Sequence, residues 1–179
     1  FEIGSAYSAR LPLQRLARPI VQQLARRTAM TAHLGVLHGD QVLYLHKEGR
    51  TRVVVDVGVR LPATITASGR ALLAALAPTQ VRAILSTEPL TRAGVSAPSH
   101  DELRKHLRED RERGWSIEDE SITQGTASIA VAVLDVAQRP VASLAVTGAV
   151  ERCGSNASTS DVRELQAAAQ LLARRLNGS

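Results

Sequence analysis

The stretch GVRLPATITASGRALLAAL, residues 58–76, decides the fold because it leads from a β-branched run into a helix of small residues. The β-branched run is Val53–Val57, which favours a strand. Thr66 and Ser68 stand where the first turn of the helix begins, and the side-chain oxygen of each can cap it. We therefore predict a strand, then an irregular turn, then a helix over 66–76.

The start of this helix is a candidate anion site. Ala67, Ser68 and Gly69 carry little bulk, so a ligand can approach their backbone N–H groups closely. Unpaired N–H groups and the positive end of the helix dipole favour a carboxylate there. The alternative is a capped turn that only packs tightly, and the sequence leaves both interpretations open.

Composition excludes several classes of protein. The 179 residues suit one domain with a core of its own. The aromatic residues are too few for a surface that stacks nucleic-acid bases. The single cysteine, Cys153, excludes an intramolecular disulfide and a cysteine-rich metal site. No apolar run approaches the roughly 18 residues of a membrane span, and no secretory signal opens the sequence. We expect a cytoplasmic protein with no membrane partner.

The net charge of +5 is concentrated near the N-terminus. Residues 1–37 hold five arginines against the single acidic residue Glu2, whereas the rest of the chain is close to balance. A basic helix can lie near phosphate or be a solvated face. We favour the solvated face, because no motif that enters a nucleic-acid groove accompanies the charge.

Periodicity predicts an α+β domain. Apolar residues at helical spacing indicate a helix over 11–29, broken at Pro19. Six strands, largely joined by hairpins, lie between helices at both ends and around one long insertion. The strands are predicted over 31–37, 41–47, 52–57, 115–122, 126–135 and 140–147, and the further helices over 66–76, 78–85, 100–113 and 161–177. The first two strands are split by a hairpin turn at 38–40, and the helix over 100–113 is expected to begin with a capping box of Ser99 and Glu102 and to end at a left-handed Gly114.

Catalytic and metal-binding motifs are absent from the sequence. The five histidines are scattered, and His33 and His46, which can face each other across the first hairpin, lack a third ligand, so we interpret them as ordinary sheet residues. No nucleophile elbow, phosphate-binding loop or dinucleotide motif occurs. Cys153 has no activating base beside it. We expect no enzyme, no metal and no cofactor.

An acidic cluster, Glu118-Asp119-Glu120, follows the only tryptophan. Strand geometry sends Glu118 and Glu120 to one face and Asp119 to the other, so one carboxylate can point inward, where it needs a partner. The alternative is an edge strand kept soluble by charge.

Small and hydroxyl side chains stand on the two strands that follow. Ser128, Ala145 and Thr147 leave a hollow on one sheet face. Together with the turn at Ser68 and a carboxylate, they can surround a small polar molecule.

The order of these motifs resembles the effector-binding domain of IclR-type bacterial transcriptional regulators, from about Leu13 to Leu176. The most specific motifs are Arg60-Leu61-Pro62 followed by Thr66–Ala71 (TASGRA), then Arg113-Gly114-Trp115 and Ala145–Gly148 (AVTG). The resemblance implies a GAF-like fold, a six-stranded antiparallel sheet flanked by helices.

The resemblance also implies a site. In the family a small organic acid or aromatic effector lies against the turn that matches Ala67 and Ser68, whose amides take its carboxylate. Polar groups and apolar walls complete the pocket, although Ser128 stands where relatives often have cysteine and Arg70 where they usually have lysine. The implied effector-binding residues are Val53, Leu61, Thr66, Ala67, Ser68, Gly69, Glu118, Asp119, Ser128, Ala145 and Thr147.

The resemblance finally implies a longer regulator. Family members bind DNA through an N-terminal winged helix-turn-helix, so residues 1–12 are expected to end the linker helix from that domain and residues 13–179 to form the effector-binding domain. A homodimer or homotetramer is expected, because operators are usually bound by symmetric proteins. The expected function is allosteric transcription regulation. The alternatives are an enzyme with Glu118 or Asp119 as general base, and an oligomerisation module with a vestigial pocket.

Overall fold

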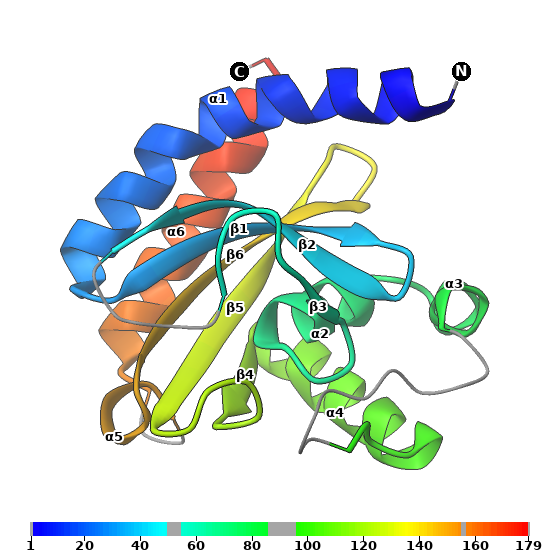
Figure 1. Ribbon diagram of the computed structural model, residues 1–179, viewed down its shortest axis with the longest axis vertical. Coiled ribbons are helices and arrows are strands. Elements are labelled where there is room, and N and C mark those ends of the chain that lie inside the picture. Colours follow the sequence, from blue (N-terminus) through cyan, green and yellow to red (C-terminus); the bar gives the residue numbers. More distant parts are fainter. Residues whose placement is uncertain (1, 50–54, 86–95, 155–156, 179) are drawn as a thin grey trace.

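A computed structural model describes residues 2–49, 55–85, 96–154 and 157–178, with the backbone alone over residues 2–11 (Figure 1). The helices are α1 (Glu2–Thr28), α2 (Ala67–Ala74), α3 (Pro78–Ile84), α4 (His100–Arg113), α5 (Val150–Cys153) and α6 (Thr159–Leu176). The strands are β1 (Thr31–His38), β2 (Gln41–Glu48), β3 (Arg60–Pro62), β4 (Ser116–Asp119), β5 (Thr126–Leu134) and β6 (Pro140–Ala149).

The strands form one curled sheet in the order β3-β2-β1-β6-β5-β4, and every neighbouring pair is antiparallel. In Figure 1, α1 and α6 pack side by side against one face, and α2 and α4 lie at the other. The predicted α+β class and the six-stranded antiparallel sheet with flanking helices are confirmed.

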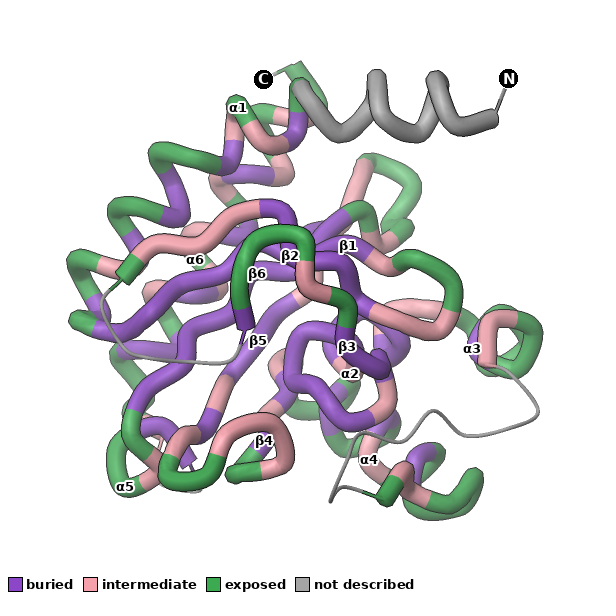
Figure 2. The backbone as a smooth tube through the Cα atoms, in the orientation of Figure 1, coloured by how far each residue is buried: buried purple, intermediate pink, exposed green. Residues whose placement is uncertain are grey.

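Strand alternation separates two cores, and both faces of the central strands are buried (Figure 2). The face under α1 and α6 carries large aliphatic side chains such as Leu34, Ile129 and Leu144. The face under α2 carries small ones, where Ala130 and Ala145 contact the first turns of α2. Because small side chains fill less space, this face is where the sheet leaves a hollow.

The prediction of a break at Pro19 is wrong, because α1 continues through Pro12 and Pro19 as one helix. Both prolines are exposed, while Ile20 and Leu24 are buried against the sheet and α6. Burial of this apolar stripe outweighs the hydrogen bond that each proline removes.

The third strand is also predicted in the wrong place. Of the strand predicted over 52–57, residues 52–54 lie outside the described residues and residues 55–57 are not strand. The segment predicted to be irregular instead forms β3 and pairs with β2, with Leu61 opposite Val42. Pro62 is tolerated because β3 is the edge of the sheet.

Two smaller departures follow from local backbone geometry. The strand predicted over 115–122 ends at Asp119, because Glu120 has a φ of 53° and turns the chain into a loop over 120–125. The short helix α5 follows the strand predicted over 140–147, at a place where no helix was predicted. The capping box of Ser99 with Glu102 and the left-handed stop at Gly114 are confirmed. Among the helices of the described residues, none is both long and apolar enough to cross a membrane.

Candidate functional site

The first turn of α2 presents two backbone N–H groups to the interior. Thr66 is the cap, and its Oγ1 accepts from the N–H of Gly69 at 3.1 Å. The N–H groups of Ala67 and Ser68 find no acceptor among the described residues. The candidate anion site therefore offers the N–H groups of Ala67 and Ser68 but not that of Gly69, because the Gly69 N–H already donates to Thr66.

Gly69 has a packing role. A Cβ at this position would lie 2.2 Å from the carbonyl oxygen of Ala63, so only glycine lets α2 pass this close to the preceding chain. This contact holds the first turn of α2 in place.

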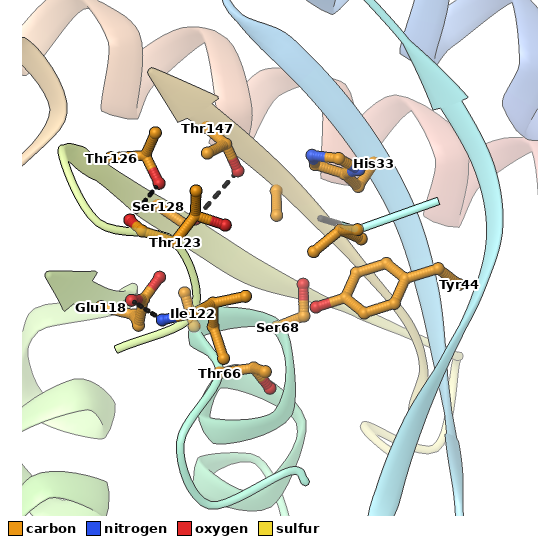
Figure 3. A pocket seen from close by; sticks show the side chains of 13 residues that line it. His33, Tyr44, Thr66, Ser68, Glu118, Ile122, Thr123, Thr126, Ser128 and Thr147 are labelled. Atoms are coloured by element: carbon orange, nitrogen blue, oxygen red, sulfur yellow. Dashed lines mark hydrogen bonds between the residues drawn. The ribbon is translucent and has the colours of Figure 1, made fainter. Parts of the chain in front are cut away.

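The two N–H groups belong to residues that line a small cavity of about 20 Å³ between α2, the sheet and the loop over 120–125 (Figure 3). The space takes one group of the size of a water molecule. Its lining residues are His33, Tyr44, Val55, Thr66, Ala67, Ser68, Glu118, Ile122, Thr123, Thr126, Ser128, Ala145 and Thr147.

Most of the predicted site residues meet at this cavity. Those that line it are Thr66, Ala67, Ser68, Glu118, Ser128, Ala145 and Thr147. Leu61 instead packs in the core beneath α2 with Val42 and Leu72, and Asp119 is exposed. Gly69 contacts Ala63 as described above, and Val53 lies outside the described residues.

Glu118 is the carboxylate of the cavity and is only 5% exposed. Its Oε1 accepts from the N–H of Ile122 at 3.0 Å. Burial raises the pKa of Glu118, and hydrogen bonds from Ile122, Ser121 and Ser128 oppose that rise. Strand alternation explains why Glu118 and not Asp119 faces the cavity: Glu118 shares its face with the buried Ser116, while Asp119 points to solvent.

Two hydroxyls form a pair beside Glu118. Ser128 and Thr147 lie opposite each other on β5 and β6, and their oxygens are 2.8 Å apart. Their interaction fixes both side chains at the wall of the cavity.

His33 is a site residue that sequence reasoning missed. It is 2% exposed, and neither ring nitrogen has a hydrogen-bond partner within the described residues. Burial lowers the pKa of His33 to about 3, with a further lowering from Lys47 and an opposing effect of Asp56. The ring is therefore neutral at pH 7. A signal was present, since His33 stands between Ala32 and Leu34 at a position whose side chain faces α2.

Tyr44 lies beside His33 and was also missed. The two rings meet edge to face, with centroids 5.8 Å apart. Burial raises the pKa of Tyr44 to about 12, and hydrogen bonds with Ser68 and Thr66 oppose that rise. Figure 3 shows the Tyr44 hydroxyl directed toward Ser68, so this ring closes one end of the cavity.

A buried ion pair holds α2 in position. Arg70 donates from Nε and Nη2 to the two carboxylate oxygens of Asp110 on α4, at 2.9 Å each, and from Nη1 to the carbonyl oxygen of Ile117 on β4. Burial raises the pKa of Asp110, and Arg70 opposes that rise. One guanidinium thus ties the helix of the anion site to the strand that carries Glu118.

The cavity is almost closed. Its volume is far below the roughly 300–1,000 Å³ of typical ligand pockets, so a ligand has to displace part of the wall. Glu118 also lines an open cleft of about 570 Å³ on its other side, where Arg70 and Arg113 contribute. Glu118 and the loop bonded to it therefore separate the cavity from solvent.

Metal and nucleophile chemistry finds no support in the described part of the chain. It holds no group of three or more side chains that can ligate a metal. Cys153 is buried, and burial raises the pKa of its thiol to about 11, which keeps it protonated.

Residues 5–174 match the family described as bacterial transcriptional regulator IclR C-terminal. The chain belongs to this family. Among curated proteins it is 33% identical over 156 residues to the Pca regulon regulatory protein of Pseudomonas putida, covering 84% of this chain and 53% of that protein. It is 31% identical over 181 residues to the HTH-type transcriptional regulator XynR of Escherichia coli K12, covering 98% of this chain and 69% of that protein. The chain thus spans about half to two thirds of these relatives.

Solved structures of IclR proteins share the fold. The C-terminal domain of the E. coli regulator KdgR superposes with a TM-score of 0.80 at 29% identity, covering 92% of this chain and 98% of that one. An IclR homolog from Microbacterium hydrocarbonoxydans, complexed with 4-hydroxybenzoate, superposes with a TM-score of 0.79 at 26% identity, covering 94% of this chain and 70% of that one. The resemblance inferred from the motifs is confirmed.

Proposed function

We propose that this domain senses a small organic acid and controls the DNA binding of an IclR-type regulator. The proposal rests on one observation: at a polar cavity, the N–H groups of Ala67 and Ser68 have no acceptor among the described residues. The positive end of α2 and these donors suit a carboxylate. The complex of a relative with 4-hydroxybenzoate, itself a carboxylic acid, supports the same class of ligand.

The remaining polar contacts come from the sheet. Glu118 and the Ser128–Thr147 hydroxyl pair meet the rest of the ligand. Entry requires the Ile122 N–H to leave Glu118, which joins the cavity to the outer cleft. Leu61 and Gly69 act indirectly in this proposal, because they pack beneath α2 and let its first turn lie close to Ala63.

In this proposal, α1 transmits the effect of ligand binding to the DNA-binding domain. Gln14, in the middle of α1, donates to the carbonyl oxygen of Leu45 on β2 at 2.9 Å, and Arg152 of α5 donates to that of Thr28 at the end of α1. Residues 2–12 are part of the same helix. In this proposal residues 1–12 form the link to a DNA-binding domain of the longer regulator. A homodimer or homotetramer would let the ligand favour one arrangement of subunits, with a typical coupling of about 1–3 kcal/mol.

A second candidate is an oligomerisation domain whose pocket no longer binds a ligand. The volume of about 20 Å³ favours it, because no metabolite fits without rearrangement. Catalysis with Glu118 as general base is weaker, because its Oε1 already accepts a hydrogen bond from the N–H of Ile122.

Ligand binding to two variants of one residue tests the proposal. Ser68→Pro removes one free N–H, whereas Ser68→Ala keeps it. In thermal-shift and calorimetric titrations with small carboxylic acids, we expect the wild type and Ser68→Ala to bind and Ser68→Pro to lose binding at least tenfold. Unfolding curves of both variants check that the fold is kept. Equal binding by Ser68→Pro and Ser68→Ala would mean that the carboxylate binds elsewhere. If none of the acids binds the wild type, the oligomerisation domain with a vestigial pocket is favoured.

A further inference from the structure

His33 is a buried polar side chain that neither the anion site nor the carboxylate of the cavity uses. It lies on β1 opposite Ala145 of β6, and both residues line the cavity. Ala145 is too small to cover the imidazole, so the ring is exposed to the cavity and not to solvent.

The surroundings of His33 offer no alternative partner within the described residues. Ser128 and Thr147, two sheet hydroxyls that line the same cavity, are bonded to each other. Tyr44 presents its ring edge to the imidazole and directs its hydroxyl to Ser68 and Thr66. Buried polar atoms in folded proteins are almost always hydrogen-bonded, so two orphaned ring nitrogens point to a group that arrives with the ligand.

The state of the ring defines the chemistry of that group. A neutral imidazole has one N–H donor and one nitrogen acceptor. Carboxylates and keto oxygens only accept hydrogen bonds, so they satisfy at most the donor. A hydroxyl both donates and accepts, whichever ring nitrogen carries the proton. Thr123 Oγ1, a second orphaned atom at the same cavity, is a further partner for such a group.

The cavity favours an aliphatic ligand. Nine of its thirteen lining residues are polar, and Tyr44 is the only Phe, Tyr or Trp among them. The space of about 20 Å³ next to these groups takes one group of the size of a hydroxyl before the wall moves.

Resting on the function proposed above, we infer that the effector is a hydroxylated aliphatic carboxylic acid and that His33 is the residue that recognises its hydroxyl group. The carboxylate lies at the N–H groups of Ala67 and Ser68, and the hydroxyl lies between the imidazole and Thr123.

Pairs of acids that differ by one hydroxyl test this inference on the full chain. The probes are glycolate with acetate, lactate with propanoate, 3-hydroxybutanoate with butanoate, and 4-hydroxybenzoate with benzoate. For at least one aliphatic pair, calorimetry of the wild type is expected to give an affinity roughly tenfold or more higher for the hydroxy acid.

His33→Phe keeps a ring of similar size against Tyr44 and removes both hydrogen-bonding nitrogens. We expect this variant to bind the two members of the pair within about threefold of each other. The matched control is His46→Phe, on the neighbouring strand outside the cavity, which is expected to keep the preference. If His33→Phe does not fold, ring ¹⁵N chemical shifts of the wild type replace it, because only those of His33 among the five histidines are expected to move on binding.

The outcomes separate this inference from the function on which it rests. Equal binding of both members of every pair by the wild type overturns the role of His33 and leaves the carboxylate site standing. A hydroxyl preference that survives in His33→Phe also overturns it, as does a preference confined to the aromatic pair. Failure of all eight acids to bind the wild type overturns both the sensing function and this inference.

Discussion

The Oε1 atom of Glu118 lies 3.0 Å from the backbone nitrogen of Ile122, and this hydrogen bond holds the loop over 120–125 against the cavity. It joins the end of β4 to the loop that precedes β5, so the carboxylate both lines the cavity and closes it.

Glu118→Gln is expected to change how stability depends on pH. The folded pKa of Glu118 is raised by burial, so the folded state holds this proton more tightly than the unfolded state does. The wild type therefore loses stability as the pH rises from the unfolded pKa, near 4.5, through the folded one. The glutamine oxygen still accepts from Ile122 but cannot ionise, so urea unfolding at pH 4.5 and 7 should show a smaller loss for the variant. Asp119→Asn, at an exposed position, is the control, and an equal change there would contradict the assignment.

His33→Phe is expected to act in the opposite direction. The pKa of His33 is about 3 when folded and 6.5 when unfolded, so the unfolded state takes up a proton that the folded state refuses. The wild type should lose about 3 kcal/mol through this residue between pH 7 and pH 4, and the variant should not. Urea midpoints at the two pH values measure the difference, with His46→Phe as the control. A loss of the same size in His33→Phe would mean that the ring is not buried neutral.

Gly69→Ala should destabilise the fold although alanine is the better helix former. The added Cβ lies 2.2 Å from the Ala63 carbonyl oxygen and 2.3 Å from its Cα, and backbone atoms cannot rotate away. We expect a loss of about 2–3 kcal/mol in unfolding free energy. Ser68→Ala, one residue earlier, should cost less than about 1 kcal/mol. A neutral Gly69→Ala would show that α2 can shift away from the Ala63 backbone.

Arg70→Met is expected to be severe, because it leaves the buried Asp110 without its bidentate partner on α2. Removing one member of a buried pair typically costs about 3–5 kcal/mol, and the loss here should lie near the lower end, because Arg113 also donates to Asp110. The double variant Arg70→Met with Asp110→Leu should recover part of that loss, since the buried carboxylate is gone and the partly exposed Arg113 can turn to solvent. Arg70→Lys keeps the charge but not the bidentate geometry, so its free energy of unfolding should lie between those of the wild type and Arg70→Met. Additive losses in the double variant would argue that the two side chains are not coupled.

Local signals were sufficient for the elements with strong end markers. The capping box at Ser99, the glycine stop at Gly114 and the hairpin turn at His38–Asp40 all act over a few residues, so their sequence patterns predicted the structure. Thr66 and Ser68 looked equivalent as caps, and only the backbone positions show that Thr66 reaches the Gly69 N–H.

Long-range packing explains where those signals failed. Pro19 carries a helix-breaking signal, yet burial of one face of α1 on the sheet keeps the helix continuous. Leu61 is predicted as a pocket wall by its place in a motif, but β3 pairs with β2 and turns Leu61 into the core beneath α2. From the sequence, His33 was interpreted as an ordinary strand residue. Only the structure shows that it lies near small side chains and that its ring nitrogens have no partner among the described residues.

By itself, the sequence determined the alternation of small and large side chains along β5 and β6, the glycine and cap at the start of α2, and the family that these motifs share. These are properties of spacing, which depends on backbone periodicity alone. Only the tertiary structure decided which carboxylate points inward, that an imidazole is buried without a partner, and how nearly the cavity is closed. Those properties depend on strand register and on how closely α2 approaches the sheet, and both are set by contacts between residues far apart in the chain.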